Sequence, residues 1–90
     1  MAVITGIPTD KYELMGAEEQ HIKINCGQYD VVLFNVPELA QQLKDGEHFN
    51  LNAVGEFDID KAYNVGRLQF MVKDYETTEY APETIWDYAF

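Results

Sequence analysis

The stretch KAYNVGRLQFMVKDYE, residues 61–76, combines a turn with a strand. Asn64 and Gly66 both tolerate a positive φ, so the chain can reverse here at low cost. Apolar and polar side chains then alternate with the period of two that is typical of a half-buried strand. The apolar face holds Leu68, Phe70 and Val72, and the polar face holds Arg67, Gln69, Met71 and Lys73. The stretch therefore predicts a strand with a core face and a basic face.

Length and composition predict one folded domain. The chain has 90 residues, of which 47% are hydrophobic, and this favours a compact core over disorder. The one cysteine, Cys26, excludes an internal disulfide and is expected to be a small buried apolar side chain. No apolar run approaches the roughly 20 residues that span a bilayer, and no signal-peptide pattern is present. We therefore expect a cytoplasmic protein.

Sixteen acidic and six basic residues give a net charge of −10. An averaged field of this sign repels phosphate and argues against general polyanion binding. The basic residues are not spread evenly, however. Four of them fall in or beside predicted strands: Lys23, Lys61, Arg67 and Lys73.

The first half of the chain predicts three strands. Residues 2–15 indicate a long, bent first strand, with Pro8 at an edge or a bulge. Residues 20–26 alternate cleanly, and residues 29–36 form a nearly continuous apolar run that is typical of a strand covered on both faces. The short connection between the second and third strands predicts a hairpin.

A short helix and a fourth strand follow. Asn35 is the expected N-cap, Pro37 suits the first turn, and the pair Asp45-Gly46 ends the helix. Residues 48–60 alternate again, and Gly55 interrupts the pattern at an inward position, which predicts a bulge. Ile59 is expected to face the core. Four phenylalanines are also expected there: Phe34, Phe49, Phe57 and Phe70.

The resulting order predicts an all-β fold, a five-stranded OB-fold Greek-key barrel over residues 1–76 with one short helix between strands 3 and 4. Five-stranded barrels with another strand order remain open. Residues 77–90 form a C-terminal tail, for which two alternatives stand: a short helix over residues 83–90 packed on the barrel, or the start of a further element.

Several short patterns, spread in order over about residues 3–76, resemble the C-terminal OB domain of RecJ, the single-strand-specific 5′→3′ exonuclease of bacteria. They are His21-Ile22-Lys23, Phe34-Asn35, Val54-Gly55-Glu56, and the run Asn64-x-Gly66-Arg67-x-Gln69-Phe70-x-Val72-x-Asp74. The resemblance implies a non-catalytic domain of a DNA repair and recombination enzyme. Its metal-dependent DHH domains are absent from this chain, so no cofactor is expected here.

The resemblance also implies partners: single-stranded DNA, the catalytic domains of the parent exonuclease, and single-stranded-DNA-binding protein. OB domains hold single strands with cations that follow the phosphates and aromatic rings that stack on bases. Tyr63 is the stacking candidate, and three side chains are candidates for hydrogen bonds to bases or backbone. The predicted nucleic-acid-binding set is Lys23, Lys61, Tyr63, Arg67, Gln69, Lys73, His21 and Asn25.

Alternative interpretations remain for these residues and for the whole chain. Lysines on a strand face are often only solvated, and the acids Glu56, Asp58 and Asp60 suit either a divalent cation or a solvated edge. A protein-interaction or scaffold module that contacts other domains or a basic partner is the alternative function. An oligosaccharide-binding barrel would need an exposed aromatic platform, which the sequence does not identify.

Overall fold

The computed structural model describes residues 1–61 and 66–80. Six strands and one short helix follow one another in this part of the chain. Their bounds are β1 (Ala2–Pro8), β2 (Tyr12–Met15), β3 (His21–Asn25), β4 (Tyr29–Leu33), α1 (Pro37–Lys44), β5 (Phe49–Ile59) and β6 (Leu68–Glu79). The predicted all-β class and the position of the helix are confirmed.

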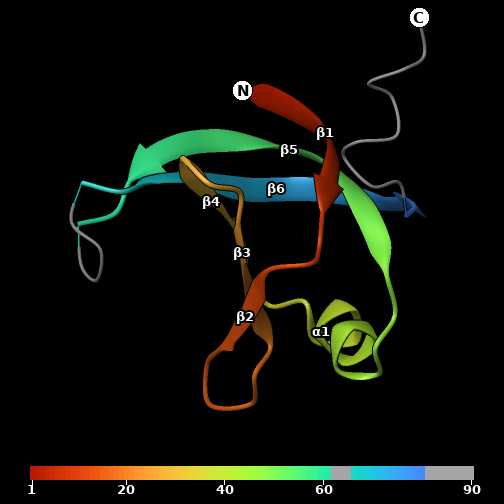
Figure 1. Ribbon diagram of the computed structural model, residues 1–90. Coiled ribbons are helices and arrows are strands. Elements are labelled where there is room, and N and C mark those ends of the chain that lie inside the picture. The colour runs from red at the N-terminus through yellow and green to blue at the C-terminus, as the bar shows by residue number, and fades with distance from the viewer. Residues whose placement is uncertain (62–65, 81–90) are drawn as a thin grey trace, which may run out of the picture.

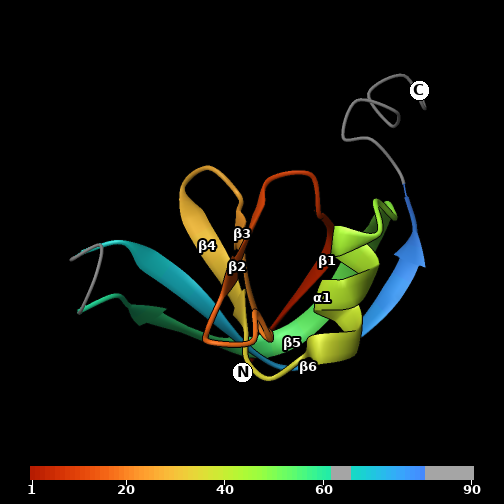
Figure 2. The ribbon, with the colours of Figure 1, turned by 90° about the horizontal axis from the view of Figure 1, so that it is seen from below.

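The strands form one sheet in the order β1-β5-β6-β4-β3-β2. Figure 1 shows β5 and β6 as a long curved pair with β2, β3 and β4 crossing it. Seen from below, the sheet curls so that β1 and α1 face β2, β3 and β4 across the interior (Figure 2). All neighbouring strands are antiparallel except β4 and β6, which are parallel. The predicted hairpin of the second and third strands is confirmed as β3 and β4.

The sheet has six strands where five were predicted, and hydrogen bonds do not close it. The difference lies in residues 2–15, which form two strands instead of one bent strand. β1 ends at Pro8, which has no N–H to continue a ladder. The next residue, Thr9, is buried and donates its hydroxyl to the Phe49 carbonyl at 2.8 Å. The chain then resumes as β2, so the two edge strands of the sheet are consecutive in sequence.

The core lies on the inner face of the curled sheet. Its fully buried side chains alternate along the strands as predicted, and α1 adds its apolar face of Leu39, Ala40 and Leu43. Val32 is also buried but lies outside this cluster, as expected for a strand covered on both faces. The largest fully buried side chains are Phe70, Ile22, Ile24, Leu33, Leu51 and Val31.

Two of the four phenylalanines expected in the core are buried there, Phe49 and Phe70, but Phe34 is 53% exposed and Phe57 46%. Phe34 follows the end of β4. Phe57 lies where β5 extends past its neighbour, because β1 begins with Ala2 opposite Gly55. The same overhang leaves Ile59 44% exposed, so the inward prediction was wrong for three residues.

The helix begins one residue later than predicted. Val36 occupies the N-cap position, and no side chain caps the helix. Asn35 instead adopts a left-handed backbone with φ of 55°, a conformation that asparagine tolerates better than most residues. Pro37 opens the helix as expected, and Asp45 with Gly46 ends it.

Two glycine predictions are confirmed. The register of β5 against β6 shifts between Val54 and Gly55, which is the expected bulge. A Cβ at Gly55 would overlap the carbonyl oxygen of Met71. Gly66 has a φ of 88°, as the turn before β6 requires. The rest of that turn, including Asn64, and the alternatives for residues 81–90 lie outside the described residues.

Candidate nucleic-acid interface

A buried carboxylate organises the polar face of β3, β4 and β6. The Asp30 side chain is 5% exposed, and it accepts two hydrogen bonds from Arg67, from Nη2 at 3.0 Å and from Nε at 3.3 Å. Lys23 Nζ lies 3.7 Å from the same carboxylate. The hydrogen bond to Asp30 raises the pKa of Arg67 above its ordinary value. A buried carboxylate destabilises the folded state unless it is paired with cations. The same pairing holds Lys23 and Arg67 in place.

Strand register explains why these side chains meet. Asn25 on β3 lies opposite Asp30 on β4, and Asp30 lies opposite Gln69 on β6. Directly opposite residues share a face of the sheet. This face is the reverse of the one that carries Ile24 and Phe70 into the core. The predicted candidates Asn25 and Gln69 are therefore in one row with the carboxylate.

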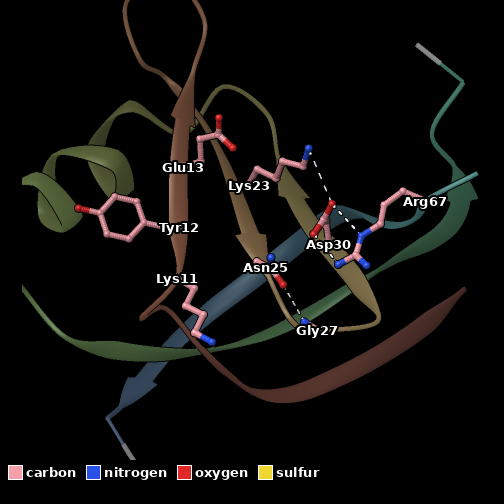
Figure 3. A pocket seen from close by; sticks show the side chains of 8 residues that line it. All are labelled: Lys11, Tyr12, Glu13, Lys23, Asn25, Gly27, Asp30 and Arg67. Atoms are coloured by element: carbon pink, nitrogen blue, oxygen red, sulfur yellow. Dashed lines mark hydrogen bonds and ion pairs between the residues drawn. The ribbon is translucent and has the colours of Figure 1, made fainter. Parts of the chain in front are cut away.

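A hollow of about 480 Å³ opens on this face. Figure 3 shows Lys23 and Arg67 directed toward Asp30, with Asn25 next to Asp30 and Lys11 farther away, its ammonium group not directed toward them. The Asn25 Oδ1 accepts the Gly27 N–H at 2.8 Å, which fixes the turn between β3 and β4 as one wall. We call this hollow the cation pocket. Its walls are completed by Tyr12, Glu13, Gly27 and Asp30.

The charge of the cation pocket is opposite in sign to that of the chain. Lys11, Lys23 and Arg67 contribute three positive charges, and Glu13 and Asp30 contribute two negative ones, which leaves +1. The whole chain carries −10. Three of its six basic residues thus line one hollow, and this concentration of cations offers an anion a local site on a repelling body.

The other predicted site residues do not join the cation pocket. Lys61 and Lys73 are exposed and do not line it. His21 Nδ1 accepts the Asn35 N–H at 2.8 Å, and its ring meets Phe34 edge-on at 5.3 Å, so its contacts are those of a structural residue. The proposed stacking residue, Tyr63, lies outside the described residues.

Sequence reasoning missed Lys11, Asp30 and Tyr12. One signal was available for Asp30, because it is the only charge inside an apolar run predicted to be covered on both faces. An acid in such a place requires a cation nearby. Lys11 had no such signal, since it precedes β2 and reaches the pocket only through the pairing of β2 with β3. Tyr12 donates its hydroxyl to the Leu43 carbonyl and ties β2 to α1.

The alternative of a divalent-cation site has no support in the described part of the chain, where no group of three or more His, Cys, Asp or Glu side chains is placed to hold a metal.

The one helix within residues 1–61 and 66–80 is too short to cross a bilayer.

Comparisons of the chain with protein families, with curated proteins and with solved structures found no match. The resemblance to the RecJ OB domain therefore stays a prediction.

Proposed function

We propose that this chain binds single-stranded nucleic acid weakly through the cation pocket. The observation that carries the proposal is that Lys11, Lys23 and Arg67 line one hollow in a chain of net charge −10. The amide of Asn25 lies beside them and adds a polar group at the same place. Asp30 holds two of these cations, Lys23 and Arg67, at fixed positions, and cations placed in this way suit a phosphate backbone.

The strand order supports an OB-type barrel as the finer description of the fold. If β1 and β2 are the two halves of one bent strand, the order β1-β5-β6-β4-β3-β2 begins and ends with that strand. Five strands then remain, with α1 between the third and fourth. OB domains bind oligonucleotides on the face of their second and third strands and through the loop between the last two strands. These correspond here to β3, β4 and the segment that contains Arg67.

The parent protein that fits this reading is a RecJ-type exonuclease, in which the domain acts as a non-catalytic aid to strand binding. The patterns around Lys23, Gly55 and Arg67 support it. In such an enzyme the metal-dependent chemistry belongs to other domains. The partners are then single-stranded DNA, those catalytic domains and single-stranded-DNA-binding protein, in the bacterial cytoplasm.

We expect the cation pocket to bind nucleic acid only weakly. Asp30 offsets part of the charge of Arg67 and Lys23, so the pocket presents only one net positive charge. Each phosphate contact adds about 0.7 to the steepness of the salt dependence for a single strand. We therefore expect binding that is measurable at low salt and absent at high salt.

The test is a fluorescence-anisotropy titration of labelled oligo-dT with the wild type and two matched double variants. Lys11→Gln with Lys23→Gln removes two pocket cations, and Lys61→Gln with Lys73→Gln removes two exposed cations outside the pocket. The first pair should weaken binding about tenfold and flatten the salt slope by about 1.4. The second pair should weaken it less than threefold. Equal losses in the two pairs, or no wild-type binding at low salt, would contradict the proposal.

A second candidate function, a protein-interaction module, has one observation in its favour. The overhang of β5 carries the exposed apolar residues Phe57 and Ile59, with the exposed acids Glu56 and Asp58 between and beside them. A basic, partly apolar partner would suit this surface. Phe57→Ser with Ile59→Ser should then abolish pull-down of purified single-stranded-DNA-binding protein or nuclease core while oligo-dT binding is unchanged.

A further inference from the structure

A second hollow of about 500 Å³ opens between β1 and the turn that joins β3 to β4. Much of its wall is apolar, with Ile4, Ile7 and Pro8 from β1 and Tyr29 from the start of β4. Polar groups stand among these side chains, including the hydroxyl of Thr5, the carboxylate of Asp10 and the amide of Asn25. Pockets that bind small ligands have roughly this size and combine apolar walls with polar groups that orient the ligand. We call this hollow the apolar slot.

The apolar slot and the cation pocket adjoin each other. Lys11, Asn25 and Gly27 line both of them. The hydrogen bond from the Gly27 N–H to Asn25 Oδ1 fixes the shared wall. A ligand that lies across this wall therefore meets cations on one side and apolar side chains on the other.

We propose that the apolar slot receives one unpaired nucleobase of a strand whose phosphate lies in the cation pocket. This inference rests on the proposed function and adds a base-binding part to it. A nucleobase has apolar faces and a polar edge, and it is joined to its phosphate through a single sugar. The cation pocket offers a place for the phosphate, and the adjoining apolar slot offers a place for the base.

A base-binding slot favours a single strand over a duplex. A base inside a duplex is stacked and paired on its Watson–Crick edge, so it enters a side pocket only after it is extruded, at a cost. A base in a single strand is free to enter. Stacking of a base on an aromatic side chain such as Tyr29 strengthens binding by about 5- to 140-fold per base. A strand without bases should lose this gain and keep only its phosphate contacts.

The first arm of the test measures oligo-dT against an oligomer of abasic sugar-phosphate units of the same length, both with the full chain at low salt. We expect oligo-dT to bind at least fivefold more tightly. If both oligomers bind equally, the apolar slot does not bind a base, and the proposed phosphate binding is still supported. If neither binds, the proposed function fails as well.

The second arm locates the base. Cys26 is the one cysteine of the chain and lines the apolar slot, so its alkylation by iodoacetamide reports whether the slot is filled. Saturating oligo-dT should slow the alkylation at least fivefold, and saturating abasic oligomer should not. Oligo-dT that is bound by anisotropy but leaves the rate unchanged would overturn the proposal.

A third arm covers the case in which the thiol reacts too slowly to follow. Thr5→Phe places a bulky side chain at the slot, and Thr77→Phe adds the same side chain at an exposed position on β6 that lines neither hollow. We expect Thr5→Phe to weaken oligo-dT binding about tenfold and to leave the abasic oligomer unaffected. Thr77→Phe should change neither. Equal affinity of Thr5→Phe and wild type for oligo-dT would contradict the slot.

Discussion

The two faces of β3, β4 and β6 follow the same alternation but are held together by different forces. On the inner face, Ile24, Val31 and Phe70 are completely buried among other apolar side chains. On the outer face, Asp30 is nearly as buried, but its partners are Lys23 and Arg67. The inner face depends on area removed from water. The outer face depends on one carboxylate that is paired well enough to be buried, and the pairing leaves two cations beside a hollow.

The largest expected effect distinguishes neighbouring residues on opposite faces. Phe70→Ala should lower the free energy of unfolding by about 3–5 kcal/mol, because it leaves a cavity in the core. Gln69→Ala, one residue away on the partly exposed outer face, should change it by less than about 0.5 kcal/mol. Urea unfolding followed by circular dichroism measures both. Similar losses of unfolding free energy in the two variants would mean that the two faces do not differ in their contribution to stability.

A smaller effect tests the outer face alone. Asp30→Asn keeps the shape of the side chain but removes its charge, so the net charge of the pocket rises from +1 to +2. We expect the protein to lose about 1–2 kcal/mol of stability and to bind oligo-dT more tightly, because Asp30 no longer offsets the charge of the pocket cations. Weaker binding by a variant that remains folded would show that Asp30 positions the cations for the ligand and does not merely offset their charge.

The smallest effect concerns pH. The hydroxyl of Tyr80 donates to Asp10 at 3.1 Å, and this bond raises the pKa of Tyr80 above its ordinary value of 10.0. The folded state therefore holds the phenol proton more tightly than the unfolded state. This contribution to stability is complete below pH 10 and is lost as the pH rises above it.

Tyr80→Phe should thus narrow the difference between the urea midpoints at pH 9 and pH 10.5. Burial raises the pKa of Tyr29 in the same direction, so part of the difference should persist in the variant. If the urea midpoints at pH 9 and pH 10.5 differ by the same amount in the variant and the wild type, Tyr80 does not contribute to the loss of stability at alkaline pH.

The sequence predicted the inner face well, because alternation is a local signal. The strands at Ile22 and Ile24, the bulge at Gly55 and the buried Phe70 all follow from period and residue type. It failed where burial depends on how far a neighbouring strand extends. Phe57 and Ile59 have the right period, but β1 begins opposite Gly55 and so does not lie beside them.

The outer face was predicted only in part. Lys23, Asn25 and Arg67 were placed on one surface from the expected order of strands, and the structure brings these three together. The role of Asp30 depends on a partner 37 positions away, and that of Lys11 on the pairing of β2 with β3. The apolar run around Asp30 marks it as an unusual charge, but no local pattern identifies partners at such distances, so its pairing and the third cation became visible only in the fold.

The measurement that tests the central claim most directly is the salt dependence of wild-type binding to oligo-dT. Three pocket cations predict a slope of log K against log salt of about −2 for a single strand. A slope near that value, reduced to about −0.7 when Lys11 and Lys23 are replaced by glutamine, would support a phosphate site in the cation pocket. The absence of binding at low salt, or binding that does not change with salt, would contradict it.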